Sequence, residues 1–186
     1  MLWIVAFAEL ILCWIVWSAA FIKPSRDAAG GSEVAKAHAS KWGIALVMMG
    51  FALVWAYLRP AGFHKSAASL IASMALGPPS VALAWAASRH LGKQWRYQAA
   101  LRADHELIQT GPYAWIRNPI YTSMLGMVLA TGFCMTWWPL FVGAVVCFVA
   151  GTEIRVRAEE RLLAERFKDE FAAYRKQVPA YIPFVR

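Results

Sequence analysis

Residues 98–121 read QAALRADHELIQTGPYAWIRNPIY and separate two long apolar parts of the chain. A charged side chain left unpaired in hydrocarbon costs roughly 2.5–3.5 kcal/mol, so this polar segment is predicted to be a connector outside the bilayer core. Gly111-Pro112 indicates a turn within it. The Asn118-Pro119 step disfavours helix at its first residue and suits the first helical position at its second. A new helix is therefore predicted to begin at Pro119.

The chain as a whole is more apolar than a soluble domain. Of its 186 residues, 60% are hydrophobic and ten are tryptophan, against about 45–50% apolar residues in soluble proteins. The formal net charge is +8, but the basic residues lie in loops between apolar runs, so nucleic acid is not a predicted partner. The cysteines lie inside apolar runs without metal-ligand spacing and predict neither a disulfide nor a metal site; they are Cys13, Cys134 and Cys147.

Three apolar runs precede the polar segment and predict three membrane-spanning helices, at residues 2–22, 42–58 and 66–88. Residues 23–41, between the first two, show no periodicity and are predicted to be a loop. Gly77-Pro78-Pro79 interrupts the third run and predicts a kink or break, because two prolines remove two backbone donors. Glu9 lies inside the first run. It either faces another helix, paired or protonated, or belongs to a substrate channel.

The apolar run over residues 120–151 is too long for one span. Thr136-Trp137-Trp138-Pro139 divides it near the middle and predicts two helices. Each half alone gives about 24 Å of helix, which is shorter than a hydrocarbon core of about 30 Å. The second helix is therefore predicted to continue into residues 152–157, which places Arg155 and Glu159 at the membrane boundary near the polar segment.

Residues 152–178 have an amphipathic helical pattern that Pro179 ends. All but two of the 19 Lys and Arg residues, Arg59 and Lys65, fall on one side of a five-span topology that begins outside. Basic loops favour the cytoplasmic side of a membrane. The prediction is an all-α polytopic membrane protein, a single domain over residues 1–186. Its N-terminus is expected outside, and its polar segment and amphipathic C-terminal helix on the cytoplasmic face.

Motifs in the second half of the chain resemble one known family. H-x-L-I-x-T-G-P-Y-x-x-x-R-N-P-I-Y starts at His105, R-x-x-x-E-E-R-L-L at Arg155, and F-x-x-Y-R-K-x-V-P-x-Y-I-P-F at Phe171. In order and spacing they are similar to the isoprenylcysteine carboxyl methyltransferase family, which is related to the phospholipid N-methyltransferases. The resemblance covers residues 98–184. It implies an integral membrane enzyme with S-adenosylmethionine as its methyl donor.

The resemblance also implies which residues bind. Residues 1–97 would supply three spans and their loops, and residues 98–186 the cofactor-binding half. Arg155 falls where the family has an arginine at the acceptor site, and its guanidinium suits a carboxylate; the alternative is an i,i+4 pair with Glu159. Arg117 either binds substrate or anchors the headgroup region. Cofactor contact is carried over to Gln98, His105, Glu106, Leu107, Ile108, Tyr113, Asn118, Pro119, Ile120, Tyr121 and Glu159.

Asn118 departs from the family pattern, which has histidine in R-H-P-x-Y. Asparagine forms hydrogen bonds but does not titrate, so proton transfer is not expected there. The chain contains no G-x-G, which excludes the glycine loop of soluble methyltransferases. The predicted function is methyl transfer to a lipophilic acceptor from the bilayer, with a prenylcysteine-like carboxylate favoured. N-methylation of a phospholipid amine and a non-catalytic membrane scaffold are the alternatives.

Overall fold

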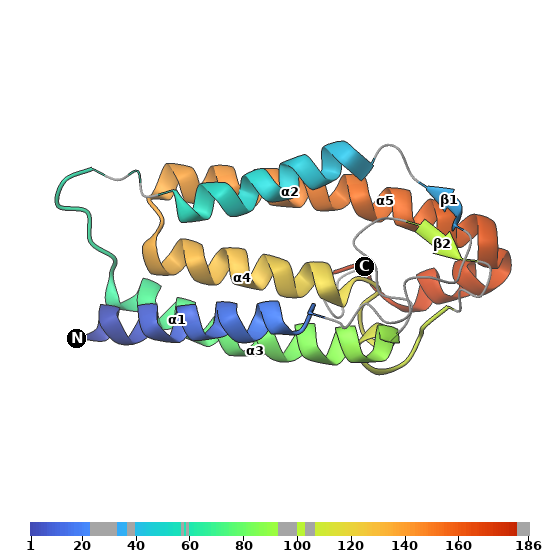
Figure 1. The fold of residues 1–186 in the computed structure, drawn as a ribbon, viewed down its shortest axis with the longest axis horizontal. Coiled ribbons are helices and arrows are strands. Elements are labelled where there is room, and N and C mark those ends of the chain that lie inside the picture. The colour runs from blue at the N-terminus through green and yellow to red at the C-terminus, as the bar shows by residue number, and fades with distance from the viewer. Residues whose placement is uncertain are drawn as a thin grey trace.

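A computed structural model describes residues 1–22, 33–36, 40–56, 58, 60–92, 100–102 and 107–181 (Figure 1). Within these residues the fold is helical, with one short two-stranded ribbon. Strands β1 (Glu33–Lys36) and β2 (Ala100–Arg102) pair antiparallel. The helices are α1 (Leu2–Ala19), α2 (Ser40–Trp55), α3 (Ala67–Leu91), the 3-10 helix η2 (Gly111–Ala114), α4 (Pro119–Met135) and α5 (Trp138–Gln177).

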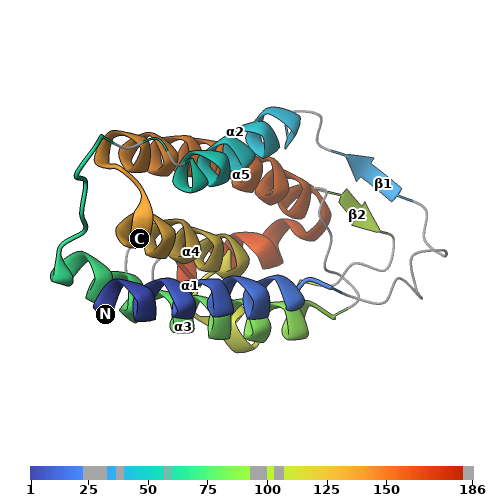
Figure 2. The same ribbon diagram turned by 60° about the vertical axis from the view of Figure 1, so that its left-hand side comes forward.

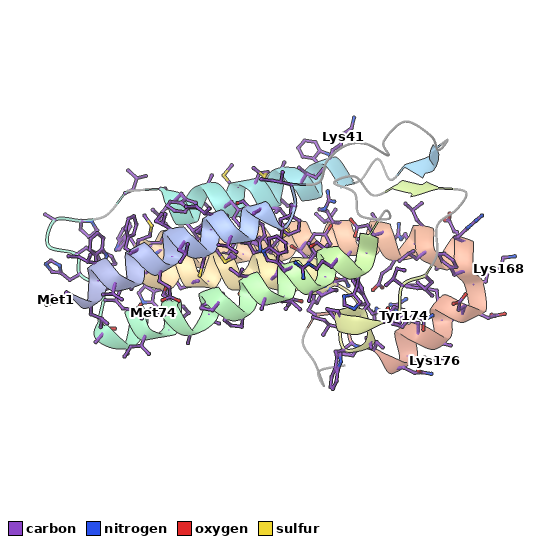
Figure 3. All side chains as sticks on the ribbon, turned by 60° about the horizontal axis from the view of Figure 1, so that its bottom comes forward. Met1, Lys41, Met74, Lys168, Tyr174 and Lys176 are labelled. Atoms are coloured by element: carbon purple, nitrogen blue, oxygen red, sulfur yellow. The ribbon has the colours of Figure 1, made fainter. Side chains whose placement is uncertain are left out.

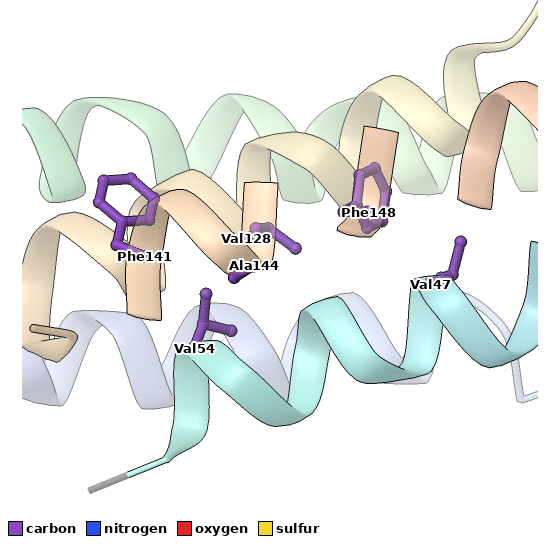
Figure 4. Packing of buried hydrophobic residues seen from close by; sticks show 6 residues of the cluster. All are labelled: Val47, Val54, Val128, Phe141, Ala144 and Phe148. Atoms are coloured by element: carbon purple, nitrogen blue, oxygen red, sulfur yellow. The ribbon is translucent and has the colours of Figure 1, made fainter. Parts of the chain in front are cut away.

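The five α-helices lie along the long axis of the molecule and form an elongated bundle (Figures 1 and 2). α2 lies along the first part of α5, while α3 lies along α4 and also contacts α1. Val47 and Val54 are two helical turns apart on α2, so both face the same core. In that core Val54, Val128 and Phe148 are each at most 1% exposed (Figure 4).

Glycines bring α2 and α5 into backbone contact. A Cβ atom on Gly151 would lie 2.7 Å from the carbonyl oxygen of Gly43, and one on Gly50 would lie 2.9 Å from that of Ala144. Larger side chains at these positions would therefore separate the helices. The close approach places Arg155, one turn after Gly151, against the start of α2. A Cβ atom on Gly43 would lie 2.6 Å from Arg155 Cγ.

Helix length and surface composition identify an integral membrane protein. In the part of the chain that the structure describes, α1, α3 and α5 are long and apolar enough to cross a membrane, whereas α2 and α4 are apolar but shorter. Hydrocarbon offers no hydrogen-bond partners to the backbone, and a helix needs none because its N–H and C=O groups bond to each other. The outside of the bundle carries large apolar side chains suited to lipid, among them Ile4, Ile15, Met48, Ile71 and Val146.

Two predicted helix boundaries are confirmed. Pro119 is the first residue of α4, and Asn118 before it has a ψ angle of 57°, outside the helical region. α4 and α5 are separated at Thr136 and Trp137, whose ψ angles of 138° and 142° are extended. As predicted, α5 continues past residue 152, so the apolar run and Arg155 belong to one helix.

Of the kink or break predicted for the third helix, the break is wrong, because α3 continues through Pro78-Pro79; the kink stays a prediction. In spanning helices, packing against neighbouring helices and serine side-chain hydrogen bonds allow proline to be tolerated. The Ser80 hydroxyl donates to a carbonyl one turn earlier in α3 at 2.7 Å, and the Ser73 hydroxyl donates to the carbonyl of Ala130 in α4 at 2.8 Å. Contact with α4 thus supports α3 beside the prolines.

The prediction of one uninterrupted helix over residues 152–178 is also wrong. Lys168 has a φ angle of 42° and divides α5 into a first arm, residues 138–167, and a return arm, residues 169–177. The return arm folds back beside the end of the first arm (Figures 1 and 3). The apolar pattern continues through the reversal because Phe171 and Tyr174 of the return arm are buried as well.

The predicted loop over residues 23–41 contains one element that the sequence did not indicate. Residues 33–36 form β1, which pairs with β2 from the polar segment at residues 100–102. The all-α prediction therefore describes the bundle but omits this ribbon. Strand pairing here joins segments far apart in the chain, and a four-residue strand leaves too little alternation to be detected.

Candidate active site at the membrane boundary

Three polar side chains from α4 and α5 meet at one end of the bundle. Arg155 Nε donates to the Tyr121 hydroxyl at 2.6 Å, and this hydroxyl donates to Glu159 Oε1 at 2.7 Å. Arg155 Nη2 donates to the same carboxylate oxygen at 3.2 Å. Arg155 is 7% exposed. These residues form a closed Arg–Tyr–Glu arrangement, here called the Arg155 cluster.

The local sequence explains how the cluster forms. Arg155 and Glu159 are one turn apart on α5, so their side chains lie on the same face. Pro119 starts α4 and places Tyr121 in its first turn, facing that side of α5. Gly43 leaves room for the arginine stem. The intrahelical pair considered from the sequence is therefore present, but the Tyr121 hydroxyl also links the pair to a second helix.

Burial and charge oppose each other at Glu159. Protein atoms around its carboxyl exclude water and raise its pKa, while the Arg155 guanidinium and the Tyr121 hydroxyl act to lower it; the net direction is upward. The side chain remains 28% exposed, so part of it is accessible to a ligand. A buried cation beside a carboxyl with a perturbed pKa is an arrangement typical of functional sites.

Arg117 holds the return arm of α5 in place. Its Nε donates to Glu160 Oε1 at 2.9 Å, and its Nη1 donates to the carbonyl oxygens of Arg175, at 3.2 Å, and Val178. The side chains of Arg117 and Glu160 are only 10% and 14% exposed, so water and salt screen this ion pair little. These contacts are intramolecular. Both roles predicted for Arg117, substrate binding and headgroup anchoring, stay predictions beside this structural role.

Residues 178–181 cross the first turn of α4 and are called the strap. The main-chain N–H and the side-chain Nδ2 of Asn118 both donate to the carbonyl of Ala180, at 3.1 Å each. The Tyr181 hydroxyl donates to Glu153 Oε2 in α5 at 2.8 Å. The strap therefore joins the start of α4 to the first arm of α5. In this arrangement Asn118 has a structural hydrogen bond.

Tyr113 in η2 is buried close to the same region. Gly111 begins η2 with a φ angle of 60°, and a Cβ atom there would lie 2.3 Å from His90 Nε2, so glycine is required. The carbonyl of Tyr113 accepts from the Tyr174 hydroxyl at 2.6 Å, which ties η2 to the return arm. Burial raises the pKa of Tyr113, and the charges of Tyr174 and Glu159 act in the same direction. The phenol therefore stays neutral.

The structure brings some of the predicted contacts together and leaves others undescribed. Tyr121 and Glu159 are hydrogen-bonded to each other within the cluster. Asn118 lies at the start of α4, the helix that contains Tyr121. Pro119 is buried, whereas Leu107, Ile108 and Ile120 are half-buried. The predicted contacts Gln98, His105 and Glu106 lie outside the described residues.

Several residues bonded into this region were not predicted as site residues. Tyr174 and Tyr181 belong to the last sequence motif, whose spacing was a usable signal. Thr122 donates to the carbonyl of Tyr181 at 2.8 Å, and Glu153 accepts from the Tyr181 hydroxyl. Neither of these two residues carries a sequence signal, because each partner lies more than 25 positions away in the chain.

The fold and the site together define a class of protein: a helical membrane protein with a buried Arg–Tyr–Glu cluster where its apolar helices end. Among the residues that the structure describes, no group of three or more His, Cys, Asp or Glu side chains is placed to hold a metal ion.

Comparison with known proteins assigns the family. A sequence model of the phospholipid methyltransferase family matches residues 68–170, which is more than half of the chain and includes the Arg155 cluster. The chain belongs to the phospholipid methyltransferase family. The predicted similarity to isoprenylcysteine methyltransferases is also confirmed by curated relatives.

These relatives match less than half of the chain. The protein-S-isoprenylcysteine O-methyltransferase of Saccharomyces cerevisiae is 30% identical over 83 residues, which cover 45% of this chain and 35% of that protein. The protein of the same name from Schizosaccharomyces pombe is 30% identical over 93 residues, covering 44% and 35%. The cobalt-zinc-cadmium resistance protein CzcN of Cupriavidus metallidurans is 30% identical over 82 residues, covering 44% and 38%. The chain thus spans just over a third of the length of each relative.

Proposed function

We propose that the protein transfers a methyl group from S-adenosylmethionine to a lipophilic acceptor that enters from the bilayer, and that this acceptor is a carboxylate of the prenylcysteine type. The observation that carries the proposal is the buried Arg155 guanidinium, which Tyr121 and Glu159 orient at one end of the helix bundle. A guanidinium presents a planar fork of donors that binds carboxylate oxygens in a fixed orientation.

The described residues fit the methyl donor in their chemistry. Glu159 offers a carboxylate to a cationic amino-acid end, and Tyr113 offers a neutral hydroxyl. Ile108 and Ile120 offer half-buried apolar surface suited to a nucleobase. On the basis of the family resemblance, we extend the same role to Gln98, His105, Glu106, Leu107, Asn118, Pro119 and Tyr121.

When bound, S-adenosylmethionine supplies a methyl group on a positively charged sulfur, which keeps the electron pair when an acceptor oxygen displaces it in line. Arg155 would orient one carboxylate oxygen toward that methyl group. The Tyr121 hydroxyl, which accepts a hydrogen bond from Arg155 Nε, would fix the orientation of the guanidinium plane. A carboxylate is already deprotonated at neutral pH, so this chemistry requires no general base, and a non-titrating Asn118 is compatible with it.

We also propose that the chain spans the membrane five times, with its N-terminus outside and the Arg155 cluster on the cytoplasmic side. The distribution of Lys and Arg residues supports this orientation. The shorter helices α2 and α4 would be accommodated by local thinning of the bilayer. Single cysteines introduced at Lys41 and Ala61 test this orientation with a membrane-impermeant maleimide in spheroplasts. The cysteine at position 61 should be labelled, and the cysteine at position 41 should not. Labelling at position 41 alone would reverse the orientation.

N-methylation of a phospholipid amine is the second candidate function, and the description of the matching family favours it. An ammonium headgroup would be repelled by the Arg155 guanidinium. Arg155 should therefore assist a carboxylate acceptor and hinder an amine. A non-catalytic scaffold is the third candidate, and it predicts no methyl transfer to either acceptor.

The test is transfer of radiolabelled methyl groups by the purified full-length chain to amine-blocked farnesylcysteine and to phosphatidylethanolamine. Arg155→Gln should lower the rate on the carboxylate about tenfold to a hundredfold, because a hydrogen bond to a charged group contributes about 1.5–3 kcal/mol. The matched control is Arg157→Gln, on the same helix with 72% of the arginine side chain exposed. Transfer to the amine alone would replace the carboxylate proposal. An unchanged carboxylate rate in Arg155→Gln would remove the role of Arg155.

A further inference from the structure

The reversal of α5 occurs at a residue type that does not favour it. Lys168 has a φ angle of 42° and a ψ angle of −112°. Glycine adopts this region freely, whereas residues with a side chain are strained there. Such strain is retained mainly where a side chain has a function. The side chain of Lys168 is therefore a candidate binding group.

A cavity of about 400 Å³ lies beside Lys168 at the α5 reversal. Its volume is within the range of small-molecule sites, about 300–1,000 Å³. Phe171, which is 2% exposed, gives it an apolar floor. Three of the lining residues are cationic and none is acidic. The lining residues are Ala164, Lys168, Phe171, Ala172, Arg175 and Lys176.

The three cationic side chains of the cavity differ in whether a carboxylate already lies close to them. Arg175 Nε lies 3.7 Å from Glu160 Oε2, so its charge is shared with that carboxylate. Lys168 at the turn and Lys176 near the end of the return arm lie outside this pair (Figure 3). Lys168 directly precedes the return arm and Lys176 is its penultimate residue, so both ends of this arm bring a lysine to the cavity. An anion in the cavity would thus be held mainly by Lys168 and Lys176.

The return arm also leads to the membrane boundary. It ends in the strap, whose Ala180 carbonyl is bonded to Asn118 at the start of the apolar helix α4. Lys176 precedes the strap by only two residues, so its end of the cavity lies near the level where α4 enters the bilayer. A basic cavity with an apolar floor at this depth suits a ligand with an anionic headgroup and an apolar body.

We propose that this cavity binds the phosphodiester headgroup of an anionic phospholipid. The phosphate lies between the ammonium groups of Lys168 and Lys176, and the glycerol end lies against Phe171. Each Lys or Arg near an anionic membrane surface strengthens binding about fivefold. This site is separate from the Arg155 cluster, so the proposal does not depend on the methyl acceptor.

The test is native mass spectrometry of the detergent-purified full chain, titrated with phosphatidylglycerol or phosphatidylcholine of identical acyl chains. We expect retention of one phosphatidylglycerol, with phosphatidylcholine retained at least about fivefold more weakly. Lys168→Gly/Lys176→Gln should weaken phosphatidylglycerol binding about 25-fold, because two cations are removed. Glycine is compatible with the backbone at residue 168, and Lys176→Gln alone, with an expected fivefold loss, serves if the double variant does not fold.

The matched control is Lys41→Gln/Arg161→Gln, which changes the net charge equally at two exposed residues outside the cavity. This control should bind phosphatidylglycerol within about twofold of the parent, because neither residue lines the cavity. Equal retention of the two lipids, or an equal loss in both double variants, would overturn the proposal. Full displacement of phosphatidylglycerol by millimolar inorganic phosphate would assign the cavity to a free anion instead.

Discussion

Gly43 is the position where the bundle and the candidate site depend most directly on each other, and Gly43→Ala tests that dependence. The added Cβ atom would lie 2.6 Å from Arg155 Cγ and 2.8 Å from the carbonyl oxygen of Gly151. The backbone oxygen cannot rotate away, so α2 and α5 must separate or Arg155 must move. Overpacking of this kind costs about 1–3 kcal/mol.

The chain offers a control for the helix propensity of alanine. Gly143 lies in α5, where a new Cβ atom would be 3.7 Å from Leu53 Cδ1, an ordinary contact. Both substitutions gain the same propensity, about 1 kcal/mol, so the difference between the variants isolates the steric effect. A steric cost of about 2 kcal/mol is taken from the middle of the range for overpacking. For a chain of this size, each kcal/mol lowers the melting temperature by about 2–4 °C, so Gly43→Ala should melt about 4–8 °C below Gly143→Ala.

The assay is thermal unfolding in detergent, followed by tryptophan fluorescence, together with the methyl-transfer rate. Gly43→Ala should also lose rate at a temperature where both variants are folded, because Arg155 is displaced from Tyr121. Identical melting temperatures and identical rates for the two variants would refute the inferred contact between the start of α2 and the Arg155 cluster.

Three further predictions concern the site. Tyr121→Phe removes the hydroxyl between Arg155 and Glu159 and should lower the rate about tenfold or more without loss of fold, as checked by circular dichroism; an unchanged rate would remove Tyr121 from the mechanism. Because burial raises the pKa of Glu159, its contribution to stability falls as pH rises through that pKa, whereas affinity for a cationic ligand rises; calorimetric titration over a pH series should show this rise for the parent and a flat profile for Glu159→Gln. Asn118→Ala removes the Nδ2 hydrogen bond to Ala180 and should destabilise the chain by about 1 kcal/mol, measured as increased proteolysis of the C-terminal strap; unchanged proteolysis would show that the side chain does not secure the strap.

Local backbone chemistry made several features of the fold predictable. Pro119 fits only the first turn of a helix, and the polar and aromatic residues at 136–138 interrupt an apolar run that is too long for one span. The polar segment was identifiable because charge is costly in hydrocarbon. Arg155 and Glu159 were identifiable as neighbours because a helix places residues four apart on one face.

Other features depend on contacts that no local pattern contains. The reversal at Lys168 has no glycine or asparagine to mark it, and the apolar pattern continues on both sides. α3 passes through Pro78-Pro79 because serines and α4 support it. Arg117 is predicted from the sequence to bind substrate or to anchor the headgroup region. Its contacts with Glu160 and with carbonyls of the return arm could not be predicted, because only that reversal brings these groups close.

The central claim is that the Arg155 cluster belongs to the binding site of a methyl donor. Isothermal titration calorimetry of the purified chain with S-adenosylmethionine and S-adenosylhomocysteine tests it most directly, with Glu159→Ala as the site variant and Arg157→Ala as the control. We predict micromolar binding, about −8 kcal/mol, that Glu159→Ala abolishes and Arg157→Ala retains. Absence of binding by the folded parent chain, or undiminished binding by Glu159→Ala, would contradict the claim.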